Sequence, residues 1–116
     1  MIVDEKKYSI IVVEDNLGDF FLLEEYVSEK IKNTSVKHFE RFSELNAFKE
    51  DVENYDIIFL DLSLPDKSGT ELVEEVLKIT KNIPVVVLTG YTDFSFALKA
   101  IALGASDYLL KDELNS

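Results

Sequence analysis

The residues best suited to chemistry in this 116-residue chain stand directly after four short apolar runs. These runs occupy residues 10–13, 57–60, 85–88 and 108–110. In chain order, the polar residues that follow them are Glu14 with Asp15, Asp61, Thr89 and Lys111. One polar residue after an apolar run means little, but four runs ending in acids, a hydroxyl and an amine indicate a shared site.

These side chains, if brought together, suit a cation and a phosphoryl group. Three neighbouring carboxylates repel one another and raise one another's pKa, and a divalent cation offsets that repulsion. Ligation by oxygen alone favours magnesium or calcium, and magnesium takes one or two carboxylates together with phosphate oxygens. Asp61 is then free to act as a nucleophile. Thr89 can donate a hydrogen bond to a phosphoryl group, and Lys111 can neutralise its charge.

A parallel sheet would bring these residues together. Short apolar runs bounded by turn formers are typical of strands buried on both faces, and the carboxyl ends of parallel strands lie on one edge. A weaker run at residues 36–42, with charges interspersed, predicts an edge strand. Asp61 therefore ends a central strand and faces the other strand ends.

Amphipathic helices are predicted between the strands. Apolar residues recur at helical spacing in the segments 20–31, 45–52, 72–77 and 94–101. Asn16 and Ser43 are plausible N-caps of the first two helices, and Gly104 is a plausible residue just past the end of the last one. The alternation predicts an α/β fold with a doubly wound, five-stranded parallel sheet and helices on both faces.

The chain length fits one domain, residues 1–116. Residues 112–116 are too few for a helix after the fifth strand, so we expect the final helix to be truncated or absent, or a partner to cover that edge. The 12 basic and 23 acidic residues argue against direct nucleic-acid binding. With no cysteine, no apolar run of membrane-spanning length and no secretory signal, a cytoplasmic location is the default.

The motifs together resemble those of receiver domains of two-component response regulators, over about residues 9–111. The resemblance rests on five segments of this sequence: Glu14-Asp15, Tyr55 to Asp61, Leu64-Pro65 with Gly69, Leu88-Thr89-Gly90, and Gly104-Ala105 with Asp107 to Lys111. It implies the strand order 2-1-3-4-5. It also implies a switch rather than an enzyme, with phosphoryl transfer from the phosphohistidine of a sensor kinase or phosphotransfer domain.

The resemblance also implies a role for each site residue. Asp61 would accept the phosphoryl group, and Lys111 and Thr89 would contact it. Glu14, Asp15, Asp61 and the backbone carbonyl of Ser63 would hold magnesium, with Glu14 acting either directly or through water.

Further positions would act in switching and signal lifetime. Thr89 and Tyr108 would form the switch, Ser63 and Tyr91 would tune the phosphoryl lifetime, and Tyr91 is expected to shield the group from water. The fourth helix and fifth strand would form the output face and a possible homodimer interface. His38, the sole histidine, is expected to be structural.

The sequence departs from the family pattern at one position, and three functions other than a phosphorylation switch remain open. The family usually has proline, preceded by a cis bond, after the conserved lysine, whereas this chain has Lys111-Asp112. The rivals are an adaptor that works without phosphorylation, an aspartate-nucleophile phosphohydrolase of the haloacid-dehalogenase type, and a flavin binder. The phosphohydrolase would need an acid where Ser63 stands, and the flavin binder a phosphate-cradling loop where two acids stand.

Overall fold

A five-stranded parallel sheet forms the centre of the computed structural model, which describes residues 6–114. The strands are β1 (Tyr8–Val13), β2 (Thr34–Phe39), β3 (Ile57–Asp61), β4 (Val85–Thr89) and β5 (Asp107–Leu110). Their order is β2-β1-β3-β4-β5, and every neighbouring pair is parallel. The predicted fold class and strand order are confirmed.

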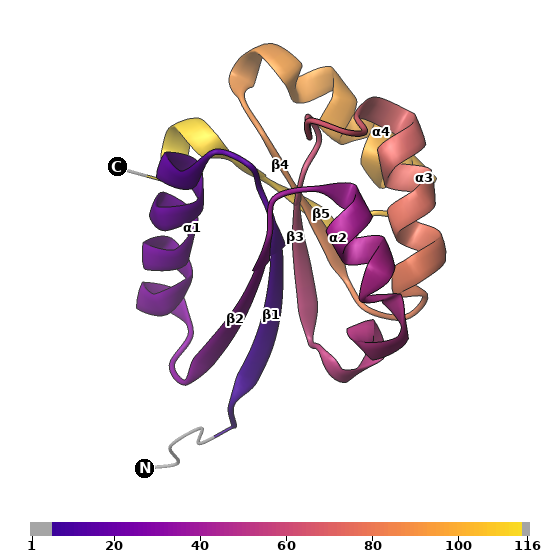
Figure 1. Ribbon diagram of the computed structural model, residues 1–116. Helices are drawn as coiled ribbons and strands as arrows, with labels where there is room; N and C mark the ends of the chain where they lie inside the picture. Colours follow the sequence, from indigo (N-terminus) through magenta and orange to yellow (C-terminus); the bar gives the residue numbers. More distant parts are fainter. Residues whose placement is uncertain (1–5, 115–116) are drawn as a thin grey trace.

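The helices cover both faces of this sheet (Figure 1). They are α1 (Leu17–Lys30), α2 (Phe42–Ala47), α3 (Gly69–Thr80) and α4 (Phe94–Leu103), with short 3-10 turns η1 (Lys49–Asn54), η2 (Tyr91–Asp93) and η3 (Lys111–Glu113). In Figure 1, α1 lies on one side of the sheet, while α2 and α3 lie on the other.

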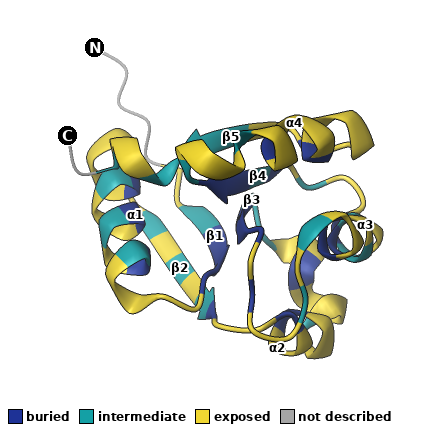
Figure 2. Cartoon of the chain, turned by 90° about the horizontal axis from the view of Figure 1, so that it is seen from above, coloured by how far each residue is buried: buried dark blue, intermediate teal, exposed yellow. Residues whose placement is uncertain are grey.

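Side chains of the central strands alternate between two cores, as the twofold period of a strand requires. In β1, Ile11 and Val13 pack in the core under α2, α3 and α4, whereas Ile10 and Val12 pack in the core under α1. Ile58, Phe59 and Leu60 of β3 are all buried, which confirms a central strand covered on both faces. Figure 2 shows these strands in dark blue between the helical layers.

Two predicted boundaries were wrong. The edge strand was expected at residues 36–42, but β2 is Thr34–Phe39, because Thr34 and Ser35 pair with Tyr8 and Ser9 of β1. Phe42, expected in that strand, begins α2 instead and is buried in the core.

The predicted N-cap Ser43 was also wrong. The N-cap residue of α2 is Arg41, whose side chain makes no capping bond. The side chain of Asp66 accepts hydrogen bonds from the backbone amides of Phe42 and Ser43, both at 2.9 Å. A loop 23 or more residues away in sequence therefore caps this helix.

Two other predicted helix ends are confirmed. Asn16 is the N-cap of α1, and its side chain accepts a hydrogen bond from the Asp19 amide at 3.0 Å. Gly104 follows α4 with φ of 131°, a backbone conformation that glycine adopts at little cost.

The α4 helix turns its small residues inward. Ala97 and Ala100 are buried, whereas Leu98 and Ile101 are 52% and 36% exposed, and α4 is largely yellow in Figure 2. This helix therefore presents apolar side chains to solvent, which its apolar spacing alone did not reveal.

On the opposite face, α1 is the only α-helix of residues 6–114 whose side chains join the second core. Ile57, Val86 and Leu109 on that face are only partly buried. After β5 the described chain forms η3, and residues 115 and 116 of the expected closing segment lie outside the described part. No helix within residues 6–114 is long and apolar enough to cross a membrane.

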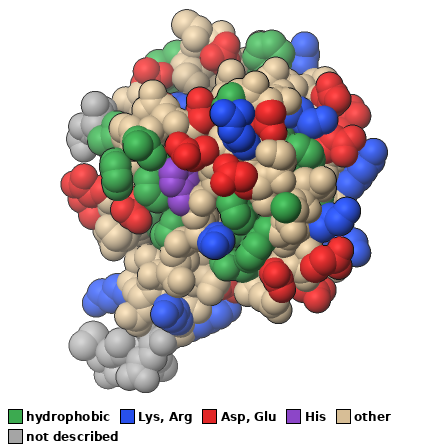
Figure 3. Space-filling model, viewed as in Figure 1, with side chains coloured by type: hydrophobic (Ala, Val, Ile, Leu, Met, Phe, Trp, Pro, Cys, Tyr) green, Lys and Arg blue, Asp and Glu red, His purple; other side chains and the backbone are tan. Residues whose placement is uncertain are grey.

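Charged side chains of both signs are interspersed on the face seen in Figure 3. The whole chain carries a formal charge of −11.

Candidate functional site

The carboxyl edge of the sheet gathers the polar residues predicted from the sequence. Strand pairing aligns Val13 with Leu60 and Asp61 with Leu88, so Glu14, Asp61 and Thr89 follow one another across β1, β3 and β4. A cleft of about 640 Å³ opens there. Its lining includes Asp15, Asp19, Asp61, Thr89 and Lys111.

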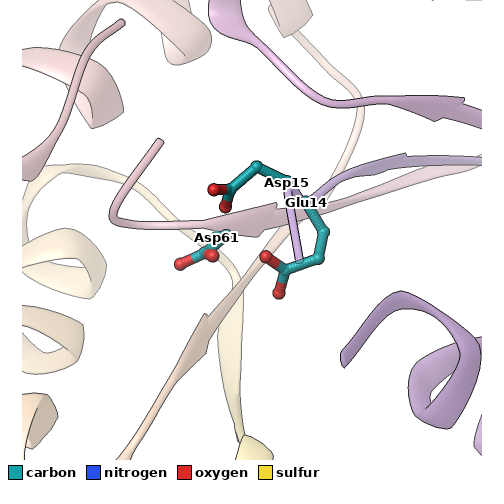
Figure 4. A group of neighbouring side chains, drawn as sticks. All are labelled: Glu14, Asp15 and Asp61. Carbon is teal, nitrogen blue, oxygen red and sulfur yellow. The ribbon is translucent and has the colours of Figure 1, made fainter. Parts of the chain in front are cut away.

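Three carboxylates meet at the base of this cleft. One oxygen from each of Glu14, Asp15 and Asp61 lies within 4.8 Å of the others, and Figure 4 shows Asp15 and Asp61 with their carboxylates side by side and Glu14 close by. Glu14 is fully buried, Asp61 is 7% exposed, and Asp15 is exposed. The cluster therefore runs from the protein interior to solvent.

A single ammonium group joins the acids. Lys111 Nζ lies 2.7 Å from Glu14 Oε1, 3.0 Å from Asp19 Oδ2 and 3.0 Å from Asp61 Oδ2. The contacts with Asp19 and Asp61 have hydrogen-bond geometry. The contact with Glu14 is short, but Oε1 has no partner with hydrogen-bond geometry within the described chain. We therefore treat the Glu14 contact as an ion pair.

These contacts shift two pKa values in the metal-free protein. Burial, and after it the neighbouring Asp61 carboxylate, raise the pKa of Glu14 to about 8, although the Lys111 ammonium acts to lower it. Burial disfavours the charged form of Lys111, but Glu14, Asp61 and Asp19 outweigh this and raise its pKa above the ordinary value. Lys111 therefore stays charged at neutral pH.

Backbone contacts hold Glu14 in place. The Asn16 amide donates a hydrogen bond to Glu14 Oε2 at 3.2 Å. His38 Nε2 lies 2.7 Å from the Glu14 carbonyl oxygen, so this ring nitrogen carries the proton. The His38 ring stacks on Phe20 with centroids 3.8 Å apart. These contacts give His38 a structural position between β2 and α1.

Asp61 is held at both oxygens. Its Oδ1 accepts a hydrogen bond from the Ser63 amide at 3.0 Å, and its Oδ2 accepts one from Lys111. Ser63 is exposed, lines the cleft and forms an isolated bridge with Ser68. The nucleophile candidate is therefore fixed in orientation at the base of an open cleft.

The remaining predicted residues lie around this centre. Thr89 is 4% exposed, and its hydroxyl donates a weak hydrogen bond to the Gly90 carbonyl at 3.3 Å. Tyr108 is half-buried and packs edge to face against Phe94, with centroids 5.2 Å apart. Tyr91 is 61% exposed and does not line the cleft.

Asp112, where the family usually has proline, contacts Tyr91. The Tyr91 amide donates to Asp112 Oδ2 at 2.9 Å, and the Tyr91 hydroxyl donates to Glu113 Oε1 at 3.3 Å. The Lys111–Asp112 bond is trans, as are all peptide bonds of the described chain. The segment that carries Lys111 is thus tied to the loop after Thr89.

Sequence reasoning missed Asp19 as a site residue. Asp19 lies in the first turn of α1, and its side chain is 33% exposed. It stands three residues after the Asn16 cap, and only the ion pair with Lys111 shows which way its side chain points.

The donor set fits a hard divalent cation. Glu14, Asp15 and Asp61 offer oxygen ligands only, as magnesium and manganese accept. The buried Glu14 Oε1, which has the Lys111 ion pair but no hydrogen bond, is an oxygen that a cation could satisfy. A bound cation would offset the negative charge of the three acids.

The sequence is similar to a known protein family and to several known proteins. The sequence profile described as the response regulator receiver domain matches residues 10–115. The sensory transduction protein LytR of Staphylococcus saprophyticus is 37% identical over 81 residues, which are 66% of this chain and 31% of LytR. The transcriptional regulatory protein FixJ of Rhizobium meliloti is 40% identical over 65 residues, 56% of this chain and 31% of FixJ. The chain thus spans less than a third of the length of these two relatives.

Solved structures agree with the sequence match. The phosphorylated cyanobacterial phytochrome response regulator RcpA has a TM-score of 0.79 and 28% identity, covering 95% of this chain and 85% of RcpA. The Mn²⁺-bound form of the response regulator Rcp1 has a TM-score of 0.75 and 27% identity, covering 93% of this chain and 87% of Rcp1. Profile, relatives and fold agree, and the chain belongs to the response regulator receiver domain family of two-component signalling systems.

Proposed function

We propose that the chain is a phosphorylation switch in which Asp61 accepts a phosphoryl group. The observation that carries the proposal is the position of Asp61. It is 7% exposed at the base of a cleft, with one oxygen held by the Ser63 amide and the other by Lys111. A carboxylate held in this way is preorganised to attack phosphorus in line.

The donor is a phosphohistidine of a sensor kinase or phosphotransfer domain. A bond forms between an Asp61 oxygen and phosphorus while the phosphorus–nitrogen bond breaks, and the bonding electron pair returns to the imidazole ring. Lys111 neutralises charge on the transferring group. Thr89 can turn its hydroxyl to a phosphoryl oxygen, because its present hydrogen bond to Gly90 is long at 3.3 Å.

Magnesium is the proposed cofactor. Glu14, Asp15, Asp61 and the Ser63 backbone carbonyl would hold it, and it would offset the charge that gathers on the acids and the phosphoryl group. The acidic cluster supports this assignment, as does the Mn²⁺-bound structure of the related Rcp1.

Signal output is proposed on the face of α4 and β5. Thr89 and Tyr108 would respond to the new charge, and both belong to strands that adjoin α4. Phe96, Leu98 and Leu103 of α4 are between 42% and 52% exposed, so this face offers apolar area to a partner. If the partner is a second copy of the chain, sedimentation equilibrium should show dimer formation after phosphorylation, and a Leu98→Glu variant should stay monomeric.

Intact mass after incubation with acetyl phosphate tests the proposal. We expect a labile gain of one phosphoryl group that needs magnesium, is lost with EDTA and is absent from Asp61→Asn. Asp51→Asn, a change at an exposed aspartate of η1, is the matched control and should be phosphorylated like wild type. A folded, magnesium-bound wild type with no gain in mass would favour the adaptor that works without phosphorylation.

A further inference from the structure

The acidic residue Asp19 is built into the site through the start of α1. Its backbone amide donates a hydrogen bond to the Asn16 cap at 3.0 Å, so the first turn of the helix fixes where the side chain begins. Its Oδ2 then lies 3.0 Å from Lys111 Nζ, and the residue lines the same cleft as Asp61. Two elements far apart in sequence, α1 and the end of β5, meet through this contact.

Asp19 and Asp61 share one ammonium group. Both Oδ2 atoms are 3.0 Å from Lys111 Nζ, so the two oxygens lie no more than about 6 Å apart and feel each other's charge. Lys111 is the one cation contacting Glu14, Asp19 and Asp61 in the described ion pairs. The cleft therefore holds more negative charge than the metal-binding acids alone would supply.

This additional negative charge should have opposite effects on the binding of the two proposed ligands. A divalent cation is attracted by every carboxylate near the cleft, whereas a phosphoryl group is repelled by a carboxylate that is not a ligand. Asp19 also competes for Lys111, because it forms an ion pair with the ammonium group that must pair with the phosphoryl oxygens. A role limited to tying α1 to β5 would not produce effects of opposite sign.

We propose that Asp19 is a positioning residue that holds Lys111 between α1 and Asp61, and that its charge favours the divalent cation while opposing the phosphoryl group. The inference rests on the proposed function, because it concerns the two ligands of that same site. Loss of the charge should make Lys111 more available to a phosphoryl group, because only its contacts with Glu14 and Asp61 remain. It should also leave the three metal-binding acids in place.

The test compares Asp19→Asn with wild type for both ligands. Magnesium alone is titrated by isothermal calorimetry, and the phosphoryl analogue beryllofluoride is titrated by NMR at saturating magnesium. Tryptophan fluorescence cannot be used because the chain has no tryptophan. The matched control is Glu24→Gln, which removes one exposed carboxylate from the same helix. Asp19→Glu, which keeps the charge, is the rescue variant.

A unit charge at this distance in a partly exposed site changes each affinity by about threefold to tenfold. We expect Asp19→Asn to bind magnesium more weakly and beryllofluoride more tightly by factors of that size. Glu24→Gln should differ from wild type by less than about twofold for either ligand, since its charge is exposed and screened. Asp19→Glu should return both affinities toward the wild-type values.

Two results would overturn the inference. Equal affinities in Asp19→Asn and wild type would show that the charge has no role, and a parallel loss of both affinities would show a purely structural contact. Failure of the proposed function gives a different pattern, in which wild type binds magnesium but no beryllofluoride. The magnesium titration still decides the role of Asp19 in that case, because unchanged magnesium affinity in Asp19→Asn would refute it.

Discussion

Removal of the Asp66 carboxylate should destabilise the protein through α2. This helix has no capping side chain of its own, and its first amides, those of Phe42 and Ser43, donate to Asp66 at 2.9 Å. In Asp66→Ala both amides lose their partner, because the first amides of a helix have no intrahelical acceptor. Phe42 is buried, so the helix start is also part of the core.

The size of the effect follows from known capping energies. Loss of one N-cap side chain costs about 0.5–2 kcal/mol, and the exposure of Asp66 favours the middle of that range, about 1 kcal/mol. For a domain of this size that lowers Tm by about 4 °C.

The effect should depend on pH with a defined sign. Slight desolvation would raise the pKa of Asp66, but hydrogen bonds from the backbone amides of Ser43 and Phe42 lower this pKa below its ordinary value. A lowered folded-state pKa stabilises the protein above the ordinary pKa, and that stability is lost as pH falls through the folded-state value.

Urea unfolding followed by circular dichroism tests this at neutral pH and at about pH 3. Asp66→Ala should be less stable than wild type at neutral pH, and the difference should shrink in acid. Asp51→Ala serves as the exposed control. Equal stability of Asp66→Ala and wild type at neutral pH would refute the capping argument, and a difference that grows in acid would refute the sign.

Three further predictions concern the site. Lys111→Ala should slow phosphorylation by acetyl phosphate by roughly a hundredfold without weakening magnesium binding, measured by intact mass and calorimetry; the exposed Lys78→Ala is the control, and an unchanged rate would contradict the role of Lys111. Glu14→Gln should weaken magnesium binding by roughly tenfold, since the variant cannot lose a proton to present a charged carboxylate to the cation, and calorimetry showing equal affinity would exclude Glu14 from the metal site. Tyr91→Ala should shorten the lifetime of the phosphorylated protein if Tyr91 shields the group from water, and a faster decay in wild type would contradict that shielding.

Residues close in sequence were predicted well. The run that ends at Asp61 predicts a buried central strand, because residues 57–60 are all apolar. The caps Asn16 and Gly104 act on helices that adjoin them, so local chemistry was sufficient there. The acids at the ends of β1 and β3 meet because parallel strands end on one edge.

Contacts that depend on folding were not predicted. Asp66 caps α2 from a distant loop, and nothing in residues 41–44 shows where that cap lies. Thr34 lay outside the predicted edge strand but pairs with Tyr8, because tertiary pairing overrides local preference. Two further features depend on which side of a helix packs against the rest of the domain. They are the buried alanines of α4 and the contact of Asp19 with Lys111.

The central claim is that Asp61 is the residue that takes the phosphoryl group, and chemical trapping tests it most directly. The protein is incubated with acetyl phosphate and magnesium, then reduced with borohydride, which converts an aspartyl phosphate to homoserine. Peptide mass spectrometry locates the product. We predict homoserine at position 61 and nowhere else, with none in the absence of magnesium. Homoserine at Asp15 or Asp19, or an unmodified Asp61 in protein that has gained a phosphoryl group, would contradict the account.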